Sequence, residues 1–172
     1  MLNEKMQKAL NEQVNAEFYS SYLYLSMSAY FLSLNLKGFA NWMRIQAQEE
    51  LAHAIKFYNY IDERNGKIEL KAIASPPAQW ISPLNAFEEV LIHENHVTSV
   101  INDLVYLAIE LKDRATESFL KWFVDEQVEE EAKAHDIIQQ LKLIGDTGPV
   151  LFMFDRELGQ RVFVNPLTAP VA

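Results

Sequence analysis

The stretch "QAQEELAH", residues 46–53, interrupts an otherwise hydrophobic helical face with a carboxylate and an imidazole. Alternating steps of four and three residues follow one face of a helix in a bundle. Here that face consists mostly of large hydrophobic side chains and reads Phe39, Met43, Gln46, Glu50, His53, Phe57, Tyr60. Glu50 and His53 are three residues apart, so they project on the same side of the helix. We therefore expect both side chains to point into the core.

The chain around this stretch is predicted to be all-α. Its 172 residues include only five glycines and six prolines, so breaks between elements are few. The segments between breaks are too long for strands and lack a period of two. Helices are predicted over residues 3–35, 38–65, 83–112 and 114–144, with a short fifth helix over 149–158.

Helix boundaries carry their own signals. Ser82 followed by Pro83 is a good N-cap and first helical position. Asn65-Gly66 and Gly145 suit helix C-termini. The connection over 66–83 is long enough to travel the length of a bundle, so that the third helix starts at its other end. The predicted fold is a four-helix bundle over residues 1–145, with 146–172 as a short helix and tail of the same domain.

Composition restricts the possible functions. The net charge of −9 argues against binding to nucleic acid or anionic membranes and is compatible with attracting cations. The absence of cysteine excludes disulfides and thiolate metal sites. No signal-peptide core or membrane-spanning stretch is recognised. We expect a soluble, cytoplasmic protein.

The other three hydrophobic faces also contain polar residues at mid-helix. The first holds Glu17, the third Glu94, and the fourth Gln127 and Glu130. A buried, unpaired carboxylate costs several kcal/mol, and one histidine cannot compensate four of them. Two cations such as iron, manganese or zinc can, because they accept carboxylate and imidazole ligands. This arrangement is typical of di-iron carboxylate bundles.

Two further features leave alternatives open. Glu49, Glu126 and Glu129 flank the hydrophobic faces. Two interpretations of them are open: a solvated acidic surface, or a third, weaker cation site. Tyr24 lies on the hydrophobic face of the first helix. It is interpreted either as an ordinary core residue or as a redox-active or hydrogen-bonding neighbour of the metals.

The combined motifs resemble the non-haem ferritins of bacteria and archaea over nearly the whole chain. The stretches that carry this resemblance are "LNEQVNAEFYSSYLYLSMSAYF" (10–31), "GFANWMRIQAQEELAHAIKFYNYI" (38–61), "SPPAQW" (75–80) and "FLKWFVDEQVEEE" (119–131). Bacterioferritins differ, because they carry Glu-x-x-His in the fourth helix and a haem-binding methionine after the bridging glutamate. Here the corresponding residues are Gln127-x-x-Glu130 and Leu51, so no haem is expected.

The resemblance implies roles for the residues singled out above. Glu17, Glu50 and His53 are expected to form the first iron site, with Glu50 bridging to a second site that Glu94 and Glu130 complete. Gln127 would hydrogen-bond to water or oxygen species beside both sites, and Tyr24 would neighbour the centre. Glu49, Glu126 and Glu129 would form a third iron site.

The resemblance also implies a function. The chain is expected to assemble into a homo-oligomeric cage of 24 subunits, to oxidise Fe(II) with dioxygen or hydrogen peroxide, and to store Fe(III) as a ferric oxyhydroxide mineral. One alternative is a diiron oxidoreductase or peroxidase without storage. Another is a bundle that metal stabilises without turnover.

Overall fold

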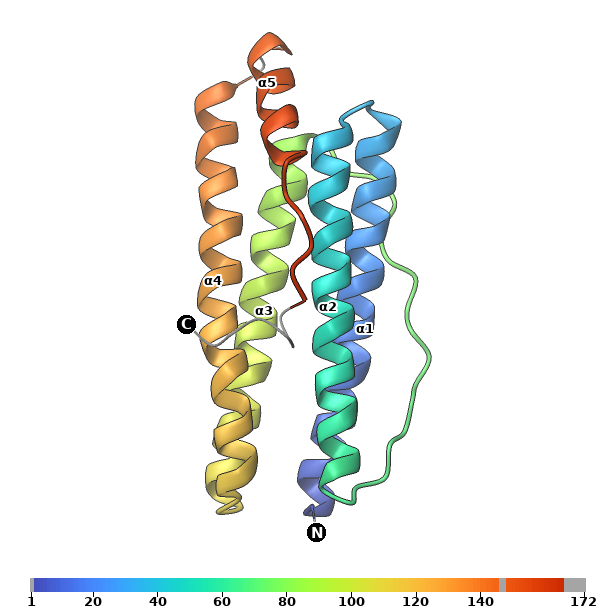
Figure 1. Ribbon diagram of the computed structural model, residues 1–172, viewed down its shortest axis with the longest axis vertical. Helices are drawn as coiled ribbons and strands as arrows, with labels where there is room; N and C mark the ends of the chain where they lie inside the picture. The colour runs from blue at the N-terminus through green and yellow to red at the C-terminus, as the bar shows by residue number, and fades with distance from the viewer. Residues whose placement is uncertain (1, 146–147, 166–172) are drawn as a thin grey trace. The chain divides into compact units, whose positions relative to one another are not determined.

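A computed structural model describes residues 2–145 and 148–165 of the chain, in which five helices and no strand occur (Figure 1). They are α1 (Glu4–Ser33), α2 (Lys37–Glu63), α3 (Pro83–Glu110), α4 (Arg114–Ile144) and α5 (Gly148–Leu158). The predicted helix boundaries differ from these by at most two residues. Parts of the predicted C-terminal segment, residues 146–147 and 166–172, lie outside the described residues.

The chain forms two compact units. One contains most of α1, all of α2, the connection up to residue 79, and α5; the other contains the first residues of α1 together with α3 and α4.

Helix ends follow the signals in the sequence. The Ser82 hydroxyl accepts a hydrogen bond from the Asn85 backbone N–H at 3.1 Å, with Pro83 at the first helical position of α3. Asp113 caps α4 in the same way, through the backbone N–H of Thr116 at 3.2 Å. Asn65, after α2, has a φ of 53°, in the left-handed region that terminates many helices.

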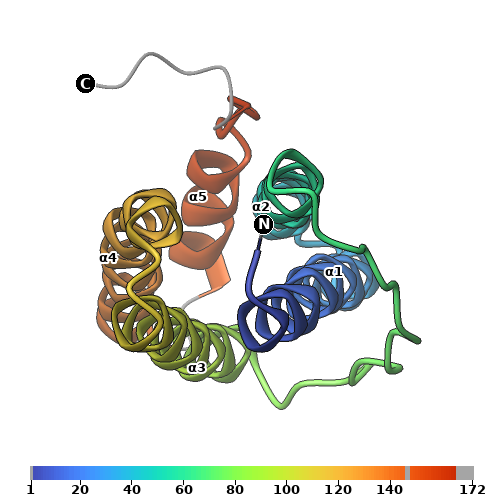
Figure 2. The ribbon, with the colours of Figure 1, turned by 90° about the horizontal axis from the view of Figure 1, so that it is seen from below.

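In the first unit, α1 and α2 are antiparallel and lie side by side (Figure 2). The Ser21 hydroxyl donates to the backbone carbonyl of Ala47 at 2.7 Å, and the Ser28 hydroxyl donates to that of Ala40 at 2.8 Å. Serine and alanine are small, so the helix backbones can approach closely at these positions. The two bonds fix the register of α2 against α1.

The connection after α2 follows the side of α1, as its length predicts. Asn11 holds its start, because its amide donates to the Lys67 carbonyl at 2.9 Å and accepts from the Glu69 backbone N–H at 2.7 Å. Further along α1, the Ser26 hydroxyl donates to the Pro77 carbonyl at 2.5 Å. The connection therefore runs from the N-terminal half of α1 toward its C-terminal end.

The short helix α5 is fixed to the start of α2. The Asp155 carboxylate accepts from the backbone N–H groups of Gly38 at 2.8 Å and Phe39 at 3.0 Å. These are N–H groups of the first turn of α2, whose own N-cap, Leu36, has no capping side chain. Asp155 thus provides from α5 the cap that α2 lacks, and its negative charge suits a helix N-terminus.

Replacing Gly38 with alanine should detach α5 from α2. A Cβ there would lie 1.5 Å from the backbone oxygen of Asp155, so the helix itself must move. We expect the free energy of unfolding to fall by about 3 kcal/mol or more, which is at or above the upper range for overpacked sites. A lower thermal midpoint measures this loss of stability. Gly148→Ala is the control, because a Cβ at Gly148 meets nothing within 4 Å. Equal midpoints for the two variants would contradict this packing.

The second unit is an antiparallel pair of long helices. Contacts between α3 and α4 include the Lys142–Glu88 ion pair, at 3.7 Å, and the hydrogen bond from Gln127 to Glu94.

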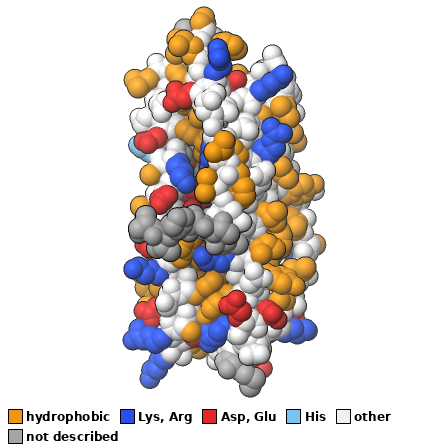
Figure 3. Space-filling view, viewed as in Figure 1, with side chains coloured by type: hydrophobic (Ala, Val, Ile, Leu, Met, Phe, Trp, Pro, Cys, Tyr) orange, Lys and Arg blue, Asp and Glu red, His pale blue; other side chains and the backbone are white. Residues whose placement is uncertain are grey.

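Among the described residues, no helix is long and apolar enough to span a membrane. Basic, acidic and hydrophobic side chains are interspersed on the face shown in Figure 3.

Candidate metal centre

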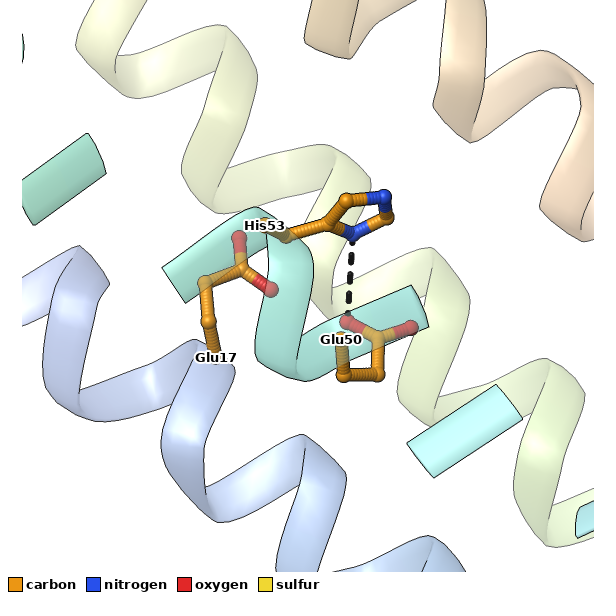
Figure 4. Close-up of side chains that lie close together, drawn as sticks. All are labelled: Glu17, Glu50 and His53. Atoms are coloured by element: carbon orange, nitrogen blue, oxygen red, sulfur yellow. Dashed lines mark ion pairs between the residues drawn. The ribbon is translucent and has the colours of Figure 1, made fainter. Parts of the chain in front are cut away.

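Glu17 of α1 and Glu50 and His53 of α2 meet inside the first unit (Figure 4). One potential ligand atom from each lies within 4.8 Å of the others, and His53 Nδ1 is 3.4 Å from Glu50 Oε2. The three residues are only 1%, 3% and 2% exposed, respectively. This group has the donor set and the size for one metal ion.

The register of the helices explains this meeting. The hydrogen-bonded pairs Ser21–Ala47 and Ser28–Ala40 define an antiparallel register, in which each step forward along α1 is matched by one step back along α2. Glu17 consequently faces the turn that begins at Glu50. His53 follows Glu50 by three residues and shares its side of the helix.

Each glutamate of this group has an amide donor one helical turn earlier. Gln13 Nε2 donates to Glu17 Oε1 at 2.8 Å, and Gln46 Nε2 donates to Glu50 Oε1 at 3.4 Å. Such hydrogen bonds orient potential metal ligands. The role of Gln13 was not predicted, although the shared Gln-x-x-x-Glu spacing is a signal in the sequence that could have revealed it.

The Glu17 carboxyl group is strongly perturbed. Burial raises its pKa from 4.5 to about 8, the negative charge of Glu50 adds to this rise, and the hydrogen bond from Gln13 opposes it. Its Oε2 atom is buried and has no hydrogen-bond partner among the described residues. A buried carboxyl with one unused oxygen fits a group that exchanges its proton for a metal ion.

In the second unit, Glu94, Gln127 and Glu130 are all buried. Gln127 Nε2 donates to Glu94 Oε2 at 3.1 Å and lies 3.2 Å from the Glu94 carbonyl oxygen. Glu130 follows Gln127 by three residues on the same side of α4. The structure thus brings Gln127 to Glu94, as the adjacent hydrophobic faces predict.

A basic side chain, missed in the sequence, partners Glu130. Lys133 Nζ lies 2.9 Å from Glu130 Oε1 and 3.9 Å from Glu129 Oε2. The Glu130 side chain is buried, whereas that of Lys133 is 38% exposed. Lys133 therefore supplies a positive charge to a buried carboxylate that would otherwise require another cation.

The candidates for a third site differ in their surroundings. Glu49 pairs with Arg161, whose Nη2 lies 2.5 Å from Glu49 Oε2. Glu126 is half-buried and Glu129 is exposed. Tyr24 is fully buried on α1, two turns beyond Glu17 and on the same face.

Buried carboxylates and an imidazole are ligands that divalent and trivalent transition metals accept, whereas sulfur-preferring metals select thiolate and thioether ligands. The fold and the site therefore define an all-helical metal-binding protein with carboxylate-rich ligands.

Comparisons with known proteins agree with this description. The family model of the ferritin-like domain matches residues 7–144. The chain is 48% identical to the bacterial non-heme ferritin of Bacteroides fragilis (strain 638R), over 94% of this chain and 100% of that protein. It is 41% identical to that of Staphylococcus aureus (strain MRSA252), over 95% and 98%. The open pore ferritin of the archaeon Archaeoglobus fulgidus is 54% identical, with a TM-score of 0.93 over 94% of this chain and 100% of that one.

The chain belongs to the ferritin family. As a ferritin it binds and stores iron, and it oxidises Fe(II). The all-α, ferritin-like fold class with a short C-terminal helix, predicted from the sequence, is confirmed.

Proposed function

We propose that this chain oxidises Fe(II) at a dinuclear centre. Glu17, Glu50 and His53 hold the first iron, and Glu94 and Glu130 hold the second, with Glu50 bridging. The observation that carries the proposal is the buried group of Glu17, Glu50 and His53, whose ligand atoms lie within 4.8 Å of one another.

The proposed ligands suit the reaction. Two Fe(II) ions held by one bridging carboxylate can each give one electron, so that dioxygen takes up two electrons and two protons to form hydrogen peroxide. Oxygen-rich ligands stabilise Fe(III) relative to Fe(II) and thereby favour the product. In this proposal Gln127, whose amide already contacts Glu94, hydrogen-bonds to water or an oxygen species, and Tyr24 is a neighbour of the centre.

The second iron site is the weaker of the two in this proposal. Glu130 supplies a carboxylate where Glu-x-x-His proteins supply an imidazole, and Lys133 competes for the same oxygen at 2.9 Å. Weak binding at this site suits Fe(III) that must leave for the mineral. A third iron would bind at Glu49, Glu126 and Glu129, giving two irons per chain at the centre and a third beside it.

The proposed assembly is a cytoplasmic cage of 24 identical chains that encloses ferric oxyhydroxide. Solved relatives are ferritins, one described as an open pore form and one as an engineered closed form. The alternative function, a diiron oxidoreductase or peroxidase without storage, needs only a small oligomer.

Native mass measurement after aerobic Fe(II) loading distinguishes the storage cage from this alternative. A cage of about 24 chains that carries iron supports storage, and a small oligomer without a mineral contradicts it.

Glu130→Ala tests the second site. We expect the initial rate of Fe(II) oxidation to fall about tenfold or more, because one iron loses a charged ligand and the paired electron transfer is impaired. Stopped-flow absorbance of Fe(III) formation measures this rate. Asp136→Ala is the matched control, an exposed acidic residue of α4. An unaltered rate in Glu130→Ala would show that Glu130 is misplaced in the proposal.

A further inference from the structure

Arg161 follows α5 in a segment, residues 159–165, that lies alongside α2 (Figure 1). Its guanidinium is shared between two α2 side chains: Nη1 donates to Gln46 Oε1 at 2.9 Å and Nη2 donates to Glu49 Oε2 at 2.5 Å. The side chains of Arg161 and Glu49 are only 17% and 14% exposed. This ion pair is therefore shielded from solvent, unlike most surface pairs.

Other contacts hold Arg161 at this place. The guanidinium carbon lies 4.5 Å from the centre of the Trp42 ring, within the range for a cation–π interaction. The Asn41 side-chain amide donates to the Arg161 carbonyl at 3.0 Å. Contacts of the Arg161 carbonyl and of the guanidinium itself together position the guanidinium before any metal arrives.

We propose that Arg161 is a tethered cation that occupies the Glu49 carboxylate and so weakens metal binding at the third site. The proposal rests on the proposed function, in which Glu49 is a third-site ligand. A carboxylate that accepts a guanidinium hydrogen bond cannot offer the same oxygen to a metal, and two nearby cations repel each other. A metal ion must therefore displace Arg161 before it binds Glu49.

Arg161 also connects this position to the first site. Because Gln46 Oε1 accepts from Arg161, its amide nitrogen is turned toward Glu50 Oε1, to which it donates at 3.4 Å. Arg161 is thus a positioning residue for Gln46 as well as a competitor at Glu49. The consequence is an order of filling: the dinuclear centre binds metal first, and the third site fills after the guanidinium has moved.

The test is a titration of the whole assembled protein with Zn(II), which does not change oxidation state, in competition with a chromophoric chelator. In the unsubstituted protein we expect two tight zinc ions per chain and a weak third. Arg161→Gln should tighten the third about tenfold and should not tighten the pair, beside which Gln46 loses the hydrogen bond from Arg161. Arg156→Gln, an exposed arginine of α5, is the matched control and should change neither.

A double-mutant cycle ties the effect to Glu49. In a Glu49→Gln background the Arg161→Gln substitution should have no effect on the affinity for the third zinc, because its target is already neutral. The same change in both backgrounds, or an unchanged third affinity in Arg161→Gln, would overturn the proposal. Absence of the tight pair in the unsubstituted protein would instead contradict the proposed function, and this proposal with it.

A second measurement needs no substitution. Hydrogen exchange followed by mass spectrometry should show faster deuterium uptake over residues 159–165 when zinc exceeds two ions per chain, because the displaced guanidinium no longer holds the segment. Uptake that is the same at two ions per chain and at saturation would overturn the proposal, even if Arg161→Gln fails to assemble.

Discussion

Glu50→Ala is expected to lower the initial rate of Fe(II) oxidation by about 100-fold or more, a larger effect than that of Glu130→Ala. Glu50 lies within metal-binding distance of both Glu17 and His53, and in the proposed centre it is the ligand that both irons share. Its loss removes the one negative charge that the two irons share and the bridge between them. Stopped-flow measurement of Fe(III) formation under dioxygen gives the rate.

Glu63→Ala is the matched control for this experiment, because Glu63 is an exposed glutamate of the same helix. It should oxidise Fe(II) at the unsubstituted rate. The Glu50→Ala protein should still elute as an intact assembly, since the substituted side chain is buried inside one chain. A rate within about threefold of the control, a difference of less than 1 kcal/mol in barrier, would contradict the role of Glu50.

The metal-free protein is expected to lose stability as the pH rises from about 5 to about 8. Burial, and next the charge of Glu50, raise the pKa of Glu17 from 4.5 to about 8, so the folded chain keeps a proton there that the unfolded chain releases. Glu17 therefore contributes stability fully below pH 4.5 and loses it as the pH rises through about 8. The slope for one such group is about 1.4 kcal/mol per pH unit.

Thermal midpoints of the metal-free protein at several pH values measure this linkage. Glu17→Gln cannot ionise, so its midpoint should fall less over the same range, and the difference between the two proteins isolates Glu17. Glu4→Gln, an exposed residue of α1, should behave like the unsubstituted chain. Bound metal requires the ionised carboxylate and should reverse the trend. Parallel curves for the unsubstituted and Glu17→Gln proteins would refute the raised pKa.

Helix periodicity explains why so much of this protein could be predicted from its sequence. Long segments without glycine or proline give helix bounds, and Ser82-Pro83 marks the start of α3. Polar residues on hydrophobic faces identify the buried candidate ligands, because burial of a carboxylate is costly unless a partner compensates it. Glu17, Glu50 and His53 were found in this way, and the structure places them together.

Contacts between distant segments could not be predicted in this way, because they leave no periodic signal. Gly38 looks like a helix breaker in the sequence, but it lies inside α2 where only a glycine allows the Asp155 backbone to approach. Arg161 lies 112 residues from Glu49, and nothing in its local sequence indicates an ion pair. The pairing of Glu49 with Arg161 was accordingly missed, and the third-site role of Glu49 remains a prediction.

If the chain oxidises Fe(II) and stores the product, the assembled protein must retain far more iron than its binding sites can hold. Metal-free protein is given a large excess of Fe(II) over protein chains in air, passed through a sizing column, and its iron and protein are measured in the same fraction. We predict that iron elutes with the assembled protein as Fe(III), in amounts far above the three ions per chain that the proposed sites could bind. Iron that stays at or below three ions per chain, while the excess precipitates outside the protein, would show that this chain does not store iron.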